Sequence, residues 1–181
     1  RFAVSFSEKI GWLAAMVIDC AFLLAVAGAA AVEIAAGRNW RNLKVLAPVT
    51  VLFAANLLFH VEVLLEGAAD IGRRLGIAAA IVLIMIIGGR IIPSFTRNWL
   101  VRENPGRLPT PFGRFDTLAI AVSTAALAAW IFFPAHFASG ALMIAAAALN
   151  AARLLRWAGE RAARDPLVLI LHIAFCFVPV G

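Results

Sequence analysis

The chain has 181 residues, of which 64% are hydrophobic and only 14% are charged, with a formal net charge of +6 at pH 7. Soluble domains carry about 25% charged residues and roughly half apolar ones, so this composition, with a mean hydropathy of +0.95, indicates a membrane protein whose apolar surface is solvated by lipid. The basic residues cluster in short segments between apolar runs, as membrane topology requires, which argues against nucleic acid as a partner.

Six apolar segments are predicted to be helices that cross the membrane. A spanning helix needs about 20 residues to cover about 30 Å of hydrocarbon, and most of the five complete segments approach or exceed this length. Strands of a membrane barrel would alternate in polarity and be half as long. The sequence therefore predicts an all-α, polytopic transmembrane helix bundle. In chain order the segments are Ile10–Ala36, Leu43–Leu65, Leu75–Phe95, Thr117–Phe133, Phe137–Leu155 and a sixth that begins at Leu167.

Both ends of the chain are typical of a fragment. The chain begins at Arg1 rather than at a methionine, and it ends at Gly181, within the sixth segment and before a full span is complete. We therefore expect residues 1–181 to form a single transmembrane domain of a longer protein, and the remaining helices of that protein to be its partners.

Turn-forming residues separate the segments. Gly37–Asn39 follows the first segment, and Asn104–Gly106 and Pro109–Pro111 fill the loop after the third. Asp165–Pro166 predicts the start of the sixth helix, with the aspartate as its cap and the proline at its first helical position.

Lysine and arginine are divided unequally between the two sides of the predicted bundle. Short loops rich in basic residues stay in the cytoplasm. We therefore expect the loops after the first, third and fifth segments to be cytoplasmic and the N-terminal end to be periplasmic. The basic side carries Arg38, Arg41, Lys44, Arg97, Arg102, Arg107, Arg114, Arg153, Arg156, Arg161 and Arg164, and the other side carries Arg1, Lys9, Arg73 and Arg74.

Asp19 and His60 are predicted to share a layer in the outer half of the membrane. At 1.5 Å per residue, Asp19 lies about 13 Å down the first segment, and His60 lies about 8 Å from the outer end of the second. Asn56 precedes His60 by four residues and so shares its helix face. A carboxylate that orients an imidazole is typical of a metal or haem ligand, and an interhelical hydrogen bond is the structural alternative.

His172, Arg90 and His136 are the other polar groups of interest. His172 is predicted in the inner leaflet with apolar neighbours, where an imidazole is either a bridge between helices or a ligand. Its depth differs from that of His60, so if both histidines bind metal they serve two sites, or each pairs with histidines outside these 181 residues. Arg90 is predicted at a similar inner depth. His136 falls in a short outer loop, which predicts a solvated interfacial side chain.

Several charges are predicted to be solvated near the ends of segments. Glu33 and Glu62 lie close to such ends and are interpreted as solvated or paired with loop arginines. The run at residues 159–166, together with Arg153 and Arg156 before it, is interpreted as a cytoplasmic anchor.

The stretch GGRIIPSFTRN, Gly88 to Asn98, interrupts the third apolar segment. Gly88 and Gly89 lack side chains, so another helix or a flat ligand could approach the backbone closely. Pro93 cannot donate an N–H, and we expect the helix to end in this stretch. Arg90 could then extend to the inner headgroups, satisfy freed carbonyls or pair with an anionic group.

The same stretch resembles a known family. IIGGRIIPSFTRNWL, Ile86–Leu100, is similar to the central signature of the NnrS family of bacterial polytopic membrane proteins. Weaker matches are RNWRNLKVLAPV at Arg38–Val49, NLLFH at Asn56–His60 and HIAFCFVPVG at His172–Gly181.

The resemblance implies an inner-membrane protein that contains haem and copper. Its genes are associated with denitrification, and it acts in nitric oxide metabolism or in protection from nitrosative stress, so nitric oxide and the lipid bilayer are the expected partners. His60 and His172 fall where the matching stretches carry histidine and are the candidate metal ligands. Arg90 is a structural residue or binds a haem propionate.

Two functions of other classes stay open from the sequence. A secondary transporter would show broken helices with charges that converge at mid-membrane, and here the charges lie towards the two faces. A cofactor-free scaffold or sensor subunit would keep its function without His60 and His172.

Overall fold

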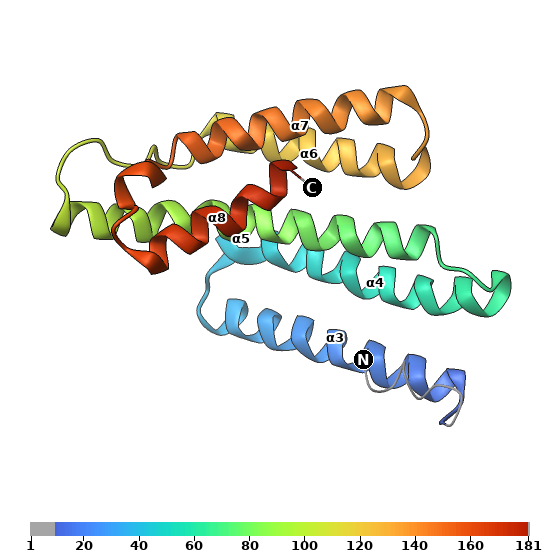
Figure 1. The fold of residues 1–181 in the computed structure, drawn as a ribbon. Helices are drawn as coiled ribbons and strands as arrows, with labels where there is room; N and C mark the ends of the chain where they lie inside the picture. Colours follow the sequence, from blue (N-terminus) through green and yellow to red (C-terminus); the bar gives the residue numbers. More distant parts are fainter. Residues whose placement is uncertain (1–9, 181) are drawn as a thin grey trace. The chain divides into compact units, whose positions relative to one another are not determined.

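The computed structural model describes residues 10–180, and every regular element in them is helical (Figure 1). The all-α fold is therefore confirmed. Arg1 and Lys9, which entered the orientation prediction, lie outside the described residues, as does the side chain of Arg41. The elements are α3 (Trp12–Ala36), η1 (Trp40–Asn42), α4 (Leu43–Glu66), α5 (Ile71–Glu103), α6 (Arg114–Phe132), α7 (Phe137–Leu155), η2 (Gly159–Ala162) and α8 (Pro166–Val180).

Five of these helices, α3 to α7, are long and apolar enough to cross a membrane. They correspond to the five complete segments predicted from the sequence, and α8 corresponds to the sixth. The predicted ends of four segments lie within a few residues of the observed ends, and Phe137–Leu155 agrees at both.

The chain forms two compact units that divide at Leu83 and Ile84, within α5. Unit 1 holds α3, η1, α4 and the first part of α5. Unit 2 holds the rest of α5 together with α6, α7, η2 and α8. A single transmembrane domain stays a prediction, and each unit is described by itself.

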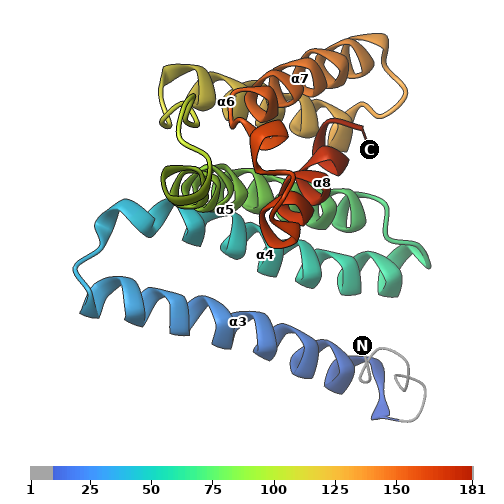
Figure 2. The ribbon, with the colours of Figure 1, turned by 60° about the vertical axis from the view of Figure 1, so that its left-hand side comes forward.

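Unit 1 is built on close contacts between helices. α3 and α4 pack against each other in a hairpin (Figure 2). The start of α5 lies so near α4 that a Cβ on Gly72 would be 2.6 Å from the backbone nitrogen of Phe59. Because only glycine lacks that Cβ, Gly72 sets how closely the two helices approach.

Unit 2 is built on a second hairpin, α6 and α7, with α8 packed against α7. Asp165 caps α8 as predicted: its Oδ1 accepts from the backbone N–H of Leu167 at 2.8 Å and of Val168 at 3.2 Å. The loop after α5 is tied to η2 by Arg161, whose Nη2 donates to the carbonyl of Asn104 at 2.9 Å and to that of Pro105 at 3.1 Å.

The predicted end of the third helix within Gly88–Asn98 is wrong, because α5 continues through Pro93 as far as Glu103. A proline removes one N–H, whereas ending the helix would leave several backbone groups without partners in an apolar medium. Continuing the helix is therefore the less costly arrangement.

Candidate functional site

The predicted layer of Asp19 and His60 is confirmed in unit 1. His60 Nε2 on α4 lies 3.3 Å from Asp19 Oδ2 on α3. The side chains keep 12% and 26% of their exposure, respectively. The pair is therefore shielded but still reachable at its edge.

A second polar contact lies next to this pair on the same two helices. Asn56 Nδ2 donates to Cys20 Sγ at 3.5 Å. Asp19 and Cys20 are adjacent on α3, and Asn56 and His60 are one turn apart on α4, so the two contacts run side by side across the helix interface. These four residues are called the α3–α4 polar belt below.

The contact with Asp19 fixes which nitrogen of His60 is available. An ionised carboxylate only accepts hydrogen bonds, so Nε2 carries the proton and donates it. The lone pair is then on Nδ1, which becomes the ring atom able to bind a metal or accept a proton. Phe59 contacts the ring edge-on, with centroids 5.8 Å apart.

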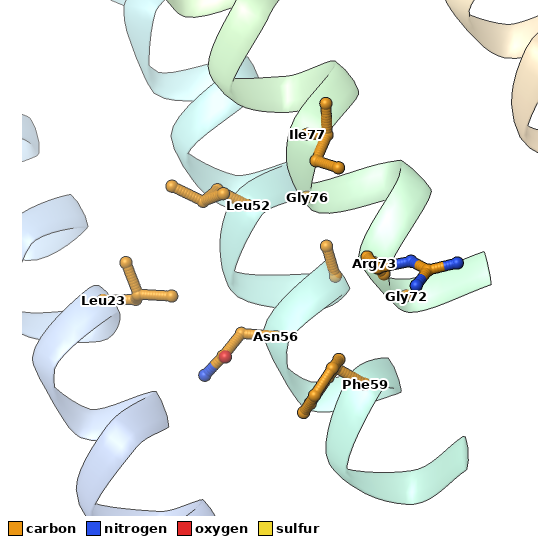
Figure 3. A pocket seen from close by; sticks show the side chains of 9 residues that line it. Leu23, Leu52, Asn56, Phe59, Gly72, Arg73, Gly76 and Ile77 are labelled. Atoms are coloured by element: carbon orange, nitrogen blue, oxygen red, sulfur yellow. The ribbon is translucent and has the colours of Figure 1, made fainter. Parts of the chain in front are cut away.

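An apolar groove lies beside the polar belt, with a volume of about 320 Å³. Leu23 of α3 faces Leu52 and Asn56 of α4 across it, and α5 closes the far side (Figure 3). Gly72 and Gly76 of α5, four residues apart, line it without a side chain of their own. The groove brings apolar volume within one turn of His60.

Glu62 is not the solvated side chain that its position near a segment end predicts. Its carboxylate is buried, and it accepts from the backbone N–H of Ile71 at 3.2 Å and of Gly72 at 2.8 Å. The first N–H groups of a helix have no partner within it. Glu62 therefore caps α5 from a neighbouring helix, which its place in the sequence alone does not reveal.

In unit 2, His172 has the contacts of a bridge between helices. Its Nδ1 lies 3.0 Å from the carbonyl of Val168 on its own helix α8, and its Nε2 lies 3.5 Å from Thr96 Oγ1 on α5. A carbonyl only accepts, so Nδ1 carries the proton and Nε2 the lone pair. Thr96 already donates to the carbonyl of Ile92 at 2.8 Å.

Arg153 lies inside unit 2, not at the solvated face that its place near a segment end predicts. It does not belong to a solvated anchor, because its side chain is 0% exposed. Nε donates to Asp116 Oδ1 on α6 at 3.0 Å, and Nη1 donates to Asn150 Oδ1 at 3.3 Å. Asn150 in turn donates to Ser123 Oγ on α6 at 2.8 Å. A charged side chain at the end of an apolar helix can point into the bundle where a carboxylate there pairs with it.

The close approach predicted at Gly88 and Gly89 is confirmed. A Cβ on Gly88 would lie 3.2 Å from the ring of Phe175 on α8, and a Cβ on Gly89 would overlap the guanidinium of Arg153 on α7. Arg90, the next residue, is exposed. The two glycines therefore provide space for side chains of this same chain.

His136 is exposed, as predicted, and its Nδ1 accepts from the backbone N–H of Ala138 at 3.1 Å, which caps α7. Among the described residues, no three histidine, cysteine, aspartate or glutamate side chains form a group that could hold a metal. His60 is the one histidine of unit 1, and unit 2 holds His172 together with the exposed His136.

The broken helices that would favour a transporter are not seen among residues 10–180. α4 and α5 each contain an internal proline, Pro48 and Pro93, and both helices continue through it.

The comparison with protein families decides the assignment. The family described as NnrS protein matches residues 1–181, the whole of the chain. The chain belongs to the NnrS family. The comparison with curated proteins finds no match, and neither does the comparison with solved structures. In this NnrS chain, Gly88 and Gly89 lie at the contact between α5, α7 and α8.

Proposed function

We propose that this chain is part of a bacterial inner-membrane protein that binds haem and copper and acts in nitric oxide metabolism or in protection from nitrosative stress. Membership of the NnrS family supports the proposal, and the contact between Asp19 and His60 is the observation that carries it. The loops after α3, α5 and α7 face the cytoplasm in this proposal.

His60 fits the role of a metal ligand. Ligating histidines usually donate their second ring N–H to a carboxylate or a carbonyl, which fixes the tautomer and raises ligand basicity. Asp19 provides that carboxylate at 3.3 Å, and Nδ1 holds the lone pair. Imidazole suits both copper and haem iron, and either metal, when bound, supplies a centre that coordinates a small ligand.

His172 and Arg90 fit less directly. The N–H of His172 Nδ1 donates to a carbonyl, which is the tautomer of a ligating histidine, but Thr96 and Gly159 cover the Nε2 side of the ring. A metal at Nε2 therefore requires Thr96 to move. Arg90 is exposed, and its fork of donors suits a haem propionate.

The apolar groove supports nitric oxide as a partner. Nitric oxide is small and uncharged, so it enters lipid and apolar cavities without the cost of burying a charge. The groove lies one turn from His60, between three helices whose outer faces are apolar. The bilayer and the remaining helices of the full-length protein complete the surroundings of the site.

The test is an optical spectrum with metal analysis of the purified full-length protein. We compare the wild type with His60→Ala and His172→Ala, and His136→Ala, an exposed histidine, is the matched control. Loss of haem or copper from His60→Ala with full retention in His136→Ala is the expected result. Full retention of both in His60→Ala and His172→Ala would remove the assignment of these ligands.

A further inference from the structure

Arg153 is fully buried and is held by three helices of unit 2. Its partner Asp116, 5% exposed, is fixed in turn by the backbone N–H of Gly113, which donates to Oδ2 at 3.0 Å at the start of α6. A buried arginine needs a complete set of partners, because an unpaired charge in an apolar interior is very costly. The position of the guanidinium is therefore set by groups that do not move independently of their helices.

Gly89 provides the space for this guanidinium on α5. A Cβ at Gly89 would overlap Arg153 Nη2, and the same Nη2 donates to the carbonyl of Met85 at 3.5 Å. Met85 is one turn before Gly89, so the end of the arginine lies along the α5 backbone. Arg153 is thus restrained from three sides: α6 through Asp116, its own helix through Asn150, and α5 through Gly89 and Met85.

The restrained guanidinium lies against the aromatic side chains that surround His172. Its Cζ is 5.4 Å from the centroid of Trp157 and 5.9 Å from that of Phe175. Trp157 is 1% exposed. It meets the edges of Phe175 and His172 with centroid distances of 4.7 Å and 6.5 Å. Cation–π attraction of this kind strengthens when the partners are desolvated, so Arg153 determines where the indole ring lies.

The imidazole of His172 is packed between this indole and a glycine. A Cβ on Gly159 would lie 2.8 Å from both Cγ and Nε2 of His172, so the ring rests on the backbone there. The remaining direction is fixed by the carbonyl of Val168 on one side and Thr96 on the other. The plane of His172 therefore depends on the position of Trp157.

We infer that Arg153 is a positioning residue for His172: anchored by Asp116 and given space by Gly89, it holds Trp157 in place, and Trp157 fixes the imidazole with Nε2 directed at Thr96. The inference deepens the proposed function, because His172 is one of its candidate ligands. It also assigns Gly89 of the family signature to the accommodation of a side chain from α7.

The first test measures the modification of each histidine by diethylpyrocarbonate, read by mass spectrometry, in the full-length protein prepared without haem and treated with a copper chelator. His172 is expected to be protected in the wild type and to react roughly tenfold faster in Arg153→Met, because loss of packing lowers the free energy of local opening. His136 is exposed and should react equally in both proteins, and His60 reports whether unit 1 is intact. An unchanged rate at His172 in a protein whose His60 keeps its wild-type rate would overturn the inference.

The second test guards against a variant that fails to fold. Gly89→Ala should raise the reactivity of His172 because the new methyl group displaces the guanidinium. Arg153→Lys keeps a cation for Asp116 but lacks the fork that occupies the space over Gly89. Adding Gly89→Ala to Arg153→Lys should therefore change the rate at His172 far less than Gly89→Ala changes it in the wild type. Equal effects in the two backgrounds would show that Gly89 does not accommodate Arg153.

Gly140→Ala is the matched control for this cycle. Gly140 is also a helical glycine of unit 2, and a Cβ there meets nothing within 4 Å. The variant should leave the rate at His172 unchanged, and an equal rise would contradict the specific role of Gly89. Because the protein is metal-free throughout, these rates are informative even if the full-length protein proves to hold neither haem nor copper, an outcome that would remove the proposed function alone.

Discussion

The polar groups of the two units differ most in how completely the protein covers them. In unit 1, Asp19 and His60 make one contact of 3.3 Å and keep 26% and 12% of their side-chain exposure. In unit 2, Arg153 and Asp116 keep 0% and 5%, and the arginine also reaches Asn150 and the carbonyl of Met85. The first pair has unused capacity for another partner, whereas the second is enclosed.

This difference distinguishes polar groups that hold helices together from polar groups that could bind a ligand. A fully enclosed ion pair is costly to break and unable to take up a ligand, so it fixes helices relative to one another. A partly exposed pair with a lone pair on His60 Nδ1 is able to exchange a partner at small cost. Exposure and a free lone pair or N–H therefore distinguish a candidate ligand from a structural polar group in a membrane helix. Charge alone does not distinguish the two.

The largest effect is expected from Arg153→Met, which leaves Asp116 buried without a partner. Breaking one side of a buried ion pair costs about 3–5 kcal/mol, so the free energy of unfolding of the full-length protein in detergent should fall by that amount. The double variant Arg153→Met/Asp116→Asn should lose less than the single variant. A loss below about 1 kcal/mol in Arg153→Met, the range of an exposed ion pair, would show that the pair is not enclosed in the membrane.

Gly72→Ala tests close packing in unit 1. Its Cβ would lie 2.6 Å from a backbone nitrogen of α4, so α4 and α5 must separate, at a cost of about 1–3 kcal/mol. Gly28→Ala on α3 is the control, because a Cβ there meets nothing within 4 Å, and alanine there should be neutral or stabilising. Equal unfolding free energies for the two variants would contradict the close contact.

Glu62→Ala tests the effect of burial within unit 1, because Glu62 is a buried carboxylate and Asp19 is a partly exposed one. Its removal leaves the first N–H groups of α5 without acceptors, which should cost about 1–2 kcal/mol, as the loss of a helix cap does. Denaturation of the full-length protein measures this. If Glu62→Ala costs no more than Asp19→Asn, burial is not what distinguishes the two carboxylates.

The smallest effect is expected from Asp19→Asn. Hydrogen bonds between membrane helices contribute on average about 0.6 kcal/mol, so the unfolding free energy should change by less than about 1 kcal/mol. Metal content should change more, because asparagine fixes the tautomer of His60 less strongly than a carboxylate does. A large loss of stability with unchanged metal content would make Asp19 a framework residue instead.

The sequence predicted what depends on spacing along one helix. Apolar length located six helices, and Asp165 before Pro166 located the start of α8. Asp19 and His60 were predicted to meet because each depth follows from counting residues along its own segment. The glycines at 88 and 89 signalled a close contact for the same local reason, although not what makes it.

The sequence did not predict what depends on rotation about a helix axis or on a neighbouring helix. Arg153 lies two residues before the end of α7, where a basic residue usually faces the headgroups, and only Asp116 on α6 turns it inward. The useful signal was Asn150, three residues before Arg153 and on the same face. Glu62 was misassigned because its role as an acceptor depends on where α5 starts. Pro93 was misassigned because a membrane helix leaves more backbone groups without partners by ending than by continuing.

The most direct test of the account measures haem and copper content together with stability in the full-length His60→Ala protein. The account predicts that cofactor is lost while the free energy of unfolding stays within about 1 kcal/mol of the cofactor-free wild type, because the contact between Asp19 and His60 contributes little to the framework. Full haem and copper content in His60→Ala would contradict it, since the partly exposed histidine of unit 1 would then not be a ligand.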